Sequence, residues 1–140
     1  MTRLDEAFAQ RLLDALDDPV TWPALAESAY ALDVRWRCPR RDLVVEGRDA
    51  VLARWQRDLA CLAGARPVTL RRAFAGRTLV HESSVAFTMP EGLSDCREVP
   101  AGARVELHCT RLLTFAAAGL VDELLLEHWT PLPPWGAHGA

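Results

Sequence analysis

The 140-residue chain has the composition of one ordinary globular domain, with half of its residues hydrophobic and a quarter charged. This length is enough to bury one hydrophobic core. The net charge of −3 argues against a nucleic-acid-binding surface, because such surfaces carry a basic excess. No apolar run has the length of a signal peptide or a membrane-spanning helix, so we expect a cytoplasmic protein with no membrane partner.

The cysteines and histidines give no indication of a metal or cofactor. The four cysteines are widely spaced without a Cys-x-x-Cys pair, which favours free thiols in a chain without a secretion signal: Cys38, Cys61, Cys96 and Cys109. No two of the four histidines have metal-ligand spacing. We therefore expect no metal site and no cofactor.

The first half of the chain predicts three helices. A capping pattern formed by Thr2 and Asp5 precedes the first helix. The apolar stripe of this helix repeats every four residues, at Leu4, Phe8, Leu12 and Leu16. A second helix begins near Thr21, with Pro23 tolerated in its first turn. The third is predicted over residues 47–64, which carry one continuous apolar face.

Strands follow from the alternation of apolar and polar residues. Residues 32–38, between the second and third helices, alternate without a break and predict a half-buried strand. Further strands are predicted at 68–75, 78–89, 104–115 and 120–130. Long antiparallel strands after helices indicate an α+β fold. We expect residues 1–130 to form a single domain, and residues 131–140, rich in Pro, Gly and Ala, to form a loosely ordered tail.

The last predicted strand carries large apolar groups on both of its faces. Leu124, Leu126 and His128 share one face, whereas Leu125 and Trp129 share the other. Because neither face resembles an ordinary solvent face, one is expected to cover the helices and the other to meet a partner. We expect a homodimer through the outer sheet face around Leu125 and Trp129.

Three segments at matching separations resemble the nuclear transport factor 2-like superfamily, in its SnoaL-like and ketosteroid isomerase-like group. Tyr30–Pro39 resembles the Tyr-Ala-Asp-Asp-…-Pro segment of that group, and Gly47–Val51 resembles its Gly-Arg-Glu/Asp-x-Ile helix entry. Phe115–Val121 is similar to its Phe-x-x-x-Gly-Lys/Arg-Ile hairpin. The resemblance implies a cone-like α+β barrel, in which a strongly curved antiparallel sheet wraps around three N-terminal helices.

The catalytic residues of the isomerases do not carry over to this chain. Those enzymes use one Tyr on the first helix and two Asp residues on strands. The resemblance aligns the Tyr with Asp14, the base Asp with Cys38 and the second Asp with Arg111. Since all three residues are replaced, the steroid isomerase mechanism is excluded, and the fold leaves the reaction open.

The same resemblance implies which side chains line a cavity. If Cys38 and Arg111 point inward, a mostly apolar set of side chains points inward with them: Val34, Trp36, Leu107, Cys109, Leu124, Leu126 and His128. Tyr30 and Trp55 match aromatic positions that flank the pocket of the isomerases. A mostly apolar cleft with a few polar groups is the usual form of a small-molecule site, so the expected partner is a small apolar ligand or substrate.

Arg111 and His128 are the main candidates for chemistry. Arg111 interrupts an apolar face, and an unpaired buried guanidinium is costly. It either anchors a carboxylate or developing enolate oxygen, or forms an ion pair with Asp14 or another acid across the cone. His128 is either a general acid or base, or a structural group. Cys38 is interpreted as a pocket-lining thiol, not a nucleophile.

The remaining polar residues are expected to lie away from the cavity. His81 and His108 are predicted on the outer face, and Glu123 and Glu127 are interpreted as solvated or interface charges. The sequence does not determine which residues of 78–89 face inward, so Glu82 is kept as an alternative acidic residue for the site.

Two hypotheses follow from these expectations. The first is a cofactor-free SnoaL-like enzyme that performs acid–base chemistry on a small, largely apolar carbonyl compound, by isomerisation, cyclisation, dehydration or hydrolysis. The second is a non-catalytic small-molecule-binding or dimerisation module of the same fold. An open cavity with an available guanidinium favours the enzyme, whereas a cavity filled by aromatic side chains favours the module.

Overall fold

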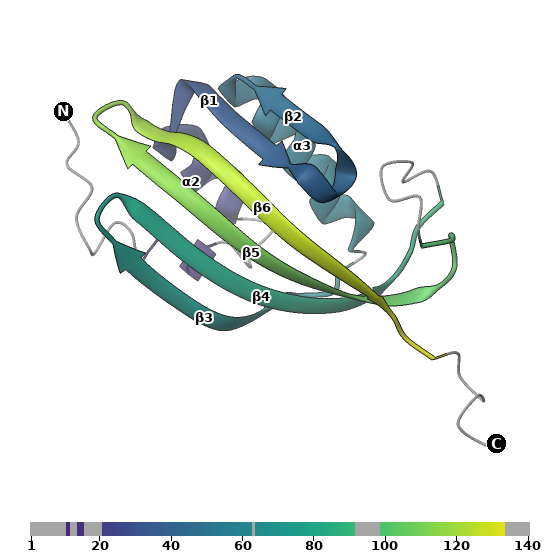
Figure 1. The fold of residues 1–140 in the computed structure, drawn as a ribbon. Coiled ribbons are helices and arrows are strands. Elements are labelled where there is room, and N and C mark those ends of the chain that lie inside the picture. The colour runs from purple at the N-terminus through teal and green to yellow at the C-terminus, as the bar shows by residue number, and fades with distance from the viewer. Residues whose placement is uncertain (1–10, 12–13, 16–20, 63, 92–98, 134–140) are drawn as a thin grey trace.

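A computed structural model describes residues 11, 14–15, 21–62, 64–91 and 99–133 of the chain. Two helices and six strands follow one another along these residues (Figure 1). Their bounds are α2 Thr21–Ala29, β1 Tyr30–Cys38, the 3-10 turn η1 Pro39–Arg41, β2 Leu43–Glu46, α3 Arg48–Cys61, β3 Val68–Ala75, β4 Thr78–Thr88, β5 Arg104–Ala116 and β6 Gly119–Pro131.

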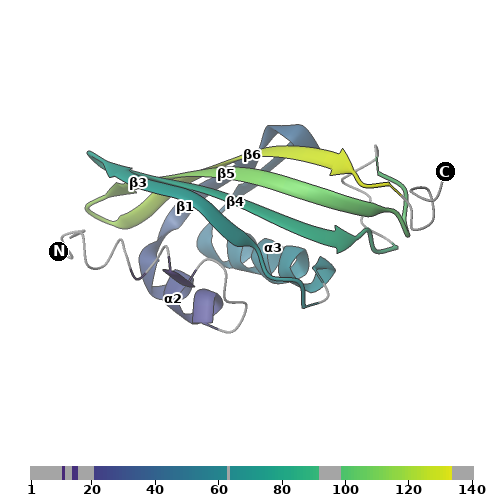
Figure 2. The same ribbon diagram turned by 90° about the horizontal axis from the view of Figure 1, so that it is seen from below.

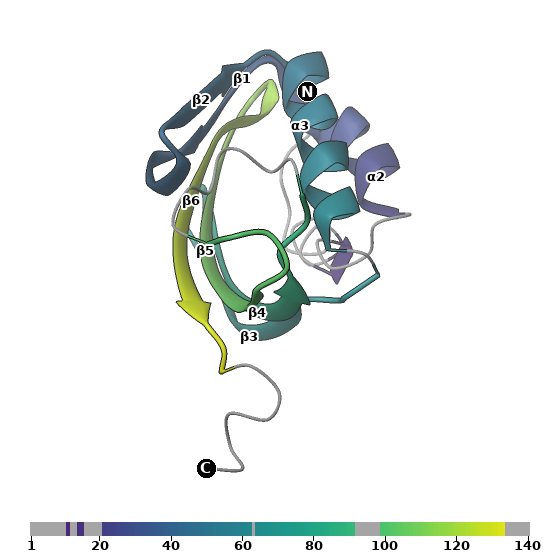
Figure 3. The same ribbon diagram turned by 90° about the vertical axis from the view of Figure 1, so that its right-hand side faces the viewer.

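The six strands form one curved sheet in the order β2-β1-β6-β5-β4-β3. All neighbouring strands are antiparallel except β1 and β6, which run parallel. The sheet bends around α3 and α2, which lie together on its concave side (Figures 2 and 3). The predicted α+β cone is therefore confirmed. Most of the first predicted helix lies outside the described residues, although Arg11, Asp14 and Ala15 are helical.

Helix α3 packs its apolar stripe against the sheet. Val51 and Trp55 are buried one turn apart, as the predicted apolar face requires. Gly47 precedes the helix with a φ of 95°, and its N–H donates to the carbonyl of Val34 at 2.8 Å. A residue with a side chain rarely adopts this backbone conformation, so the glycine fixes where the chain leaves β2 and enters α3.

The β5–β6 hairpin passes very close to the end of α2. Gly119 has a φ of 111°, and a Cβ atom placed on it would lie 2.4 Å from the carbonyl oxygen of Ala29. Only glycine satisfies both conditions. This close approach brings the start of β6 beside the start of β1, where Tyr30 lies opposite Leu120.

A bulge near the start of β6 determines which side chains of this strand face the helices. Phe115 lies opposite Leu120, but Thr114 lies opposite Asp122, so Val121 is an extra residue in β6. An extra residue reverses the inward and outward faces beyond it. Assigning every second residue after the buried Leu120 to the interior therefore gives the wrong inward face for the remainder of β6.

The predicted inward face of β6 is consequently wrong. Leu124, Leu126 and His128 point to the outer face, and Leu126 is 46% exposed. The inward side chains are Glu123, Leu125, Glu127 and Trp129. Leu125 and Trp129, predicted at a dimer interface, are 1% and 8% exposed within the protomer. They pack in the core and are not available to a partner chain.

Strand β4 presents a clear inward face. Its buried side chains alternate along the strand: Leu79, His81, Ser83, Val85 and Phe87. His81 is 1% exposed, so its predicted position on the outer face is wrong. His108 does lie on the outer face, where its Nε2 is 3.3 Å from Glu82 Oε1. Glu82 therefore does not face the interior.

The buried residues form two apolar clusters. One surrounds Trp36 and Trp55, and the other surrounds Phe87 and Trp129, whose rings meet edge to face at 5.8 Å. No helix in the described part of the chain has the length and apolar character needed to cross a membrane. Residues 134–140 of the predicted tail lie outside the described residues, and β6 itself extends to Pro131.

Candidate functional site

A cavity lies between α3 and the inner faces of β4, β5 and β6. Its apolar wall includes residues of both core clusters, namely Trp55, Leu62, Val85, Phe87, Leu107 and Trp129. Its polar members are Arg41, Asp58, His81, Ser83, Arg111 and Glu127. The cavity volume is about 70 Å³. Space of this size holds roughly five water molecules, which matches one aromatic ring with a carbonyl group attached.

Arg111 enters this cavity from the centre of the sheet. Its strand neighbours are His81 on β4 and Leu125 on β6. The guanidinium carbon lies 4.0 Å from the centroid of the Trp55 ring, so the ring holds the guanidinium by a cation–π contact. Among the described residues, Nη1 has no hydrogen-bond partner. Arg111 therefore brings to the cavity wall a guanidinium whose donors are not all used by the described residues.

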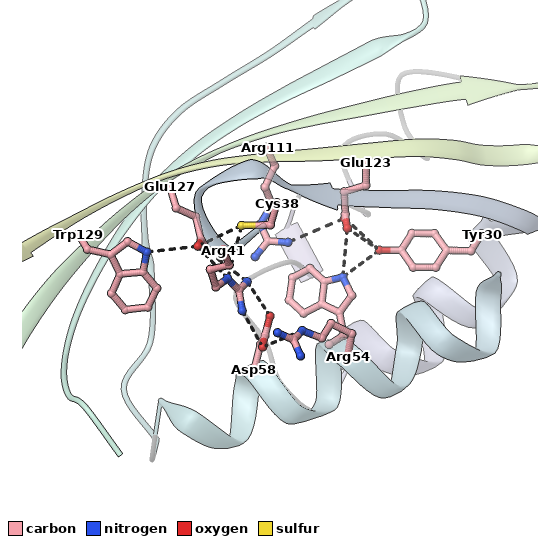
Figure 4. Close-up of polar contacts among 10 residues, drawn as sticks. Tyr30, Cys38, Arg41, Arg54, Asp58, Arg111, Glu123, Glu127 and Trp129 are labelled. Atoms are coloured by element: carbon pink, nitrogen blue, oxygen red, sulfur yellow. Dashed lines mark hydrogen bonds and ion pairs between the residues drawn. The ribbon is translucent and has the colours of Figure 1, made fainter. Parts of the chain in front are cut away.

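Glu123 lies behind Arg111 and has no exposed surface. Its Oε1 is 3.8 Å from Arg111 Nη1, an ion pair longer than a hydrogen bond (Figure 4). The Tyr30 hydroxyl donates to both carboxylate oxygens, at 3.0 and 3.2 Å, and Trp55 Nε1 donates to Oε2 at 3.3 Å. Burial raises the pKa of the Glu123 carboxyl, although Arg111, Tyr30 and Trp55 each oppose this shift.

Of the two predicted alternatives for the ion pair of Arg111, Asp14 or another acid, the structure shows the second. Asp14 forms its ion pair with Arg72 on β3. The partner of Arg111 is Glu123, which sequence analysis assigned to solvent or an interface. Because β6 changes its inward face at Val121, no count along the strand from the hairpin could identify this acid.

A second polar cluster closes the cavity wall at η1. Arg41 Nε donates to Glu127 Oε1 at 2.9 Å, while Nη1 and Nη2 donate to the two Asp58 oxygens at 3.1 and 3.0 Å. The Trp129 indole N–H also donates to Glu127 Oε1, at 3.3 Å. Bidentate contacts of this kind are strong and directional. The acidic groups of this cluster are thus already engaged by donors, and Figure 4 shows Arg41 between them.

The cysteines near the cavity are poor nucleophiles. Cys38 donates its thiol hydrogen to Glu127 Oε1 at 3.2 Å, and burial raises its pKa to about 11. Burial also raises the pKa of Cys109, to about 12. Because the thiolate is the reactive form, neither residue is activated near neutral pH.

His81 is the imidazole that the structure brings to the cavity. Its side chain lines the cavity on β4, between the positions of Leu79 and Ser83. Its Nε2 lies 3.0 Å from Thr69 Oγ1 on the edge strand β3. When Nε2 donates to this hydroxyl, the basic lone pair of the ring is on Nδ1. An imidazole at the strand position opposite Arg111 therefore lines the same cavity.

The predicted site residues divide into three groups. Trp55, Leu107, Cys109 and Arg111 line the cavity as expected. A second group is buried in the adjoining core, consisting of Tyr30, Val34, Trp36 and Cys38. The third group lies away from the cavity, consisting of Asp14, Leu124, Leu126 and His128.

Six polar residues in or behind the cavity wall were not predicted: Arg41, Asp58, His81, Ser83, Glu123 and Glu127. The strand alternation of β4 carries the signal for His81, because Leu79, Val85 and Phe87 share its parity. Nothing comparable identifies Arg41, which a short 3-10 turn directs inward. Within the described part of the chain, no group of three or more His, Cys, Asp or Glu residues is arranged to hold a metal ion.

Comparisons with known proteins support the fold. No protein-family model matches the chain, and no curated protein matches its sequence. Among solved structures, a protein from Jannaschia sp. CCS1 described as a SnoaL-like polyketide cyclase is similar, with a TM-score of 0.71 and 15% identity. That match covers 91% of this chain and 90% of the other.

Two further structures have the same architecture. An NTF2-like protein from Cytophaga hutchinsonii ATCC 33406 gives a TM-score of 0.68 at 13% identity, covering 88% of this chain and 98% of the other. A protein with a ketosteroid isomerase-like fold from Catenulispora acidiphila DSM 44928, in complex with trimethylamine, gives 0.59 at 13% identity, covering 88% and 86%. At these identities the likeness establishes the fold alone.

Proposed function

We propose that this chain, which has the cone fold of the NTF2-like proteins, performs acid–base chemistry on a small, largely apolar carbonyl compound. The observation that carries the proposal is that His81 and Arg111 occupy directly opposite positions on β4 and β5. Both side chains line the same, mostly apolar cavity. In this proposal the carbonyl oxygen accepts a hydrogen bond from Arg111, and His81 moves the proton.

The proposed step is proton abstraction from the carbon next to the carbonyl group. The proton passes to the basic nitrogen of His81, and the electrons of the broken C–H bond form the enolate. The guanidinium of Arg111 stabilises the negative charge on the enolate oxygen. Return of the proton from His81 to a different carbon completes an isomerisation. In a cyclisation the enolate carbon attacks a second carbonyl group of the same molecule, and the alkoxide that forms takes the proton back from His81.

The surrounding side chains support this assignment by holding Arg111 in place. Trp55 contacts its guanidinium on one face, and Glu123 is itself fixed by Tyr30 and Trp55. A donor that is already oriented loses little free energy to reorganisation during the reaction. The Arg41 cluster has a different role, because its donors and acceptors engage one another and stabilise the wall of the cavity.

The experiment that tests this function combines binding and proton exchange. 2-Indanone is a suitable probe because it is small, largely apolar and carries acidic hydrogens next to its carbonyl group. We expect the protein to bind it, as a rise in melting temperature, and to accelerate exchange of those hydrogens for deuterium in D2O. Arg111→Met should lose both effects, whereas Arg35→Met, on an exposed part of β1, should retain them.

A second candidate is a small-molecule-binding module without catalysis. The observation in its favour is that Cys38, at the position of the isomerase base, carries a thiol whose pKa is raised to about 11 by burial. The same probe separates the two functions. Binding that depends on Arg111, without any acceleration of deuterium exchange by several small ketones, would favour the module.

A homodimer remains part of the proposal, with a corrected surface. Leu112 and Leu124 lie opposite each other on the outer faces of β5 and β6, and Leu126 follows on the same face. Leu126 is 46% exposed. We propose that this outer apolar surface, defined by Leu112, Leu124 and Leu126, meets a second copy of the chain.

A further inference from the structure

The charged groups around the cavity balance one another. Three guanidinium groups, those of Arg41, Arg54 and Arg111, face three carboxylates, those of Asp58, Glu123 and Glu127. Arg41 pairs with Asp58 and Glu127, and Arg54 lies 3.6 Å from Asp58. Arg111 is thereby left with Glu123 as its counter-ion. With every acid ionised, this described cluster carries no net charge.

Glu123 lies beside the Nη1 end of the Arg111 guanidinium and offsets its positive charge. The ion pair is 3.8 Å long, and Nη1 has no hydrogen bond to any described residue. Arg111 lines the cavity, whereas Glu123 has no exposed surface. A ligand in the cavity therefore meets a guanidinium whose positive charge is already compensated by a carboxylate outside the cavity lining.

We infer that Glu123 is a specificity-determining residue that makes the Arg111 site select neutral carbonyl compounds over carboxylates. The inference rests on the proposed function, because it concerns the ligand class of the same cavity. A neutral carbonyl oxygen accepts the Arg111 hydrogen bond and leaves the balance of charges unchanged. A carboxylate adds an uncompensated negative charge to a poorly hydrated site, which is costly.

The proposed reaction is compatible with this balance. When the proton leaves the ligand for His81, an imidazolium and an enolate form together, so the net charge of the site stays constant. The groups that face Glu123 come from four elements: Tyr30 of β1, Trp55 of α3, Arg111 of β5 and the neighbouring Asp122 of β6. Arg111 is the cation among them, so the charge of Glu123 acts chiefly on it.

The test uses two probes of nearly the same shape, acetophenone and benzoate, with dissociation constants measured by NMR titration at pH 8. We expect the wild type to bind acetophenone more tightly than benzoate. Glu123→Gln removes the negative charge while keeping an acceptor for Tyr30. Because one buried charge at this distance shifts an ionisation by about one to three pKa units, benzoate affinity should rise at least about tenfold relative to acetophenone.

Matched variants distinguish the inference from the proposed function. Glu106→Gln removes an exposed carboxylate from the outer face and should leave the ratio of the two affinities unchanged. If Glu123→Gln leaves the ratio unchanged while Arg111→Met abolishes binding, the inference is wrong and the proposed ligand site stands. If neither probe nor 2-indanone binds the wild type, the proposed function fails and the inference fails with it.

A second variant keeps the test decisive if Glu123→Gln does not fold. Tyr30→Phe removes the donor of two hydrogen bonds to Glu123, which favours the protonated carboxyl and weakens the compensation of Arg111. Benzoate affinity relative to acetophenone should then rise in the same direction, by a smaller factor. An unchanged ratio in this variant, with acetophenone still bound, overturns the inference.

Discussion

His81 and Arg111 lie directly opposite each other on β4 and β5, and both side chains line the same cavity. Directly opposed residues of an antiparallel pair have Cβ atoms about 4.5–5.5 Å apart. The ladder of backbone hydrogen bonds therefore sets the separation between the proposed proton carrier and the proposed oxyanion donor. Neither residue depends on a loop for its position, which suits a site that must hold its geometry during a reaction.

Replacing His81 should separate binding from chemistry. We expect His81→Gln to retain 2-indanone binding, because Arg111 is still present, and to reduce deuterium exchange by about 10²-fold or more. The matched control is His128→Gln, which removes an imidazole from the outer face of β6. Exchange rates followed by NMR provide the measurement. Equal losses in both variants would mean that neither imidazole acts at the carbonyl compound.

The prediction about His128 was wrong for a local physical reason. The inward faces were correctly predicted for Val34, Trp36 and Cys38 of β1 and for β5. Leu32, predicted on the same face of β1, is 73% exposed, because the register of β1 is irregular between Tyr30 and Arg35. In β6 the sequence Leu124-Leu125-Leu126 has no alternation, and Val121 forms a bulge that reverses the faces. Apolar pattern alone cannot detect such a bulge. The two buried acids of β6, Glu123 and Glu127, were therefore assigned to the outside.

The fold was easier to predict than the site. Periodicity identified α3 and the five longer strands, because burial of an apolar face repeats along the whole element, but not the four-residue strand β2. A site depends instead on single polar residues whose direction is set by neighbouring turns. Arg41 is the clearest example, since a 3-10 turn ended by Asp42 in the left-handed conformation directs its guanidinium between two carboxylates. No periodic pattern indicates that direction.

Removing the Arg41 guanidinium should destabilise the protein strongly. Its side chain is 4% exposed, and Arg41→Met leaves the buried carboxylate of Glu127 and the partly exposed carboxylate of Asp58 without their main partner. Breaking a buried ion pair in this way costs about 3–5 kcal/mol. The free energy of unfolding in urea provides the measurement. Arg35→Met, which removes an exposed pair with Glu46, should cost no more than about 1 kcal/mol. Similar costs in the two variants would contradict a structural role for the Arg41 cluster.

A charge on the outer apolar surface should prevent the proposed dimer. We expect the wild type to sediment as a dimer at micromolar concentration, and Leu126→Glu to sediment as a folded monomer, because a buried unpaired carboxylate opposes association. Val68→Glu is the control, since Val68 is 63% exposed on the edge strand β3, away from β6 in the sheet order. A wild-type monomer would eliminate the dimer, and a dimer that persists in Leu126→Glu would place the interface elsewhere.

The buried carboxyl of Glu123 should make stability fall as the pH rises. Its pKa in the folded protein is raised above the ordinary value of 4.5 mainly by burial, so the folded state binds the proton more tightly than the unfolded state. Its contribution is therefore fully present below about pH 4.5 and is lost as the pH rises through the folded pKa, by at most about 1.4 kcal/mol per pH unit.

Subtracting a variant isolates this group from the other acids. We expect the unfolding free energy of the wild type minus that of Glu123→Gln to decrease between pH 4.5 and 8 in urea titrations. The same difference taken with Glu106→Gln, an exposed acid, should stay flat. A difference for Glu123 that increases with pH would mean that Arg111, Tyr30 and Trp55 together hold its carboxylate more tightly than burial opposes it. In that case the ion pair of Arg111 and ionised Glu123 would stabilise the folded protein. Glu123 would then stay ionised, and would offset the charge of Arg111, under acidic conditions.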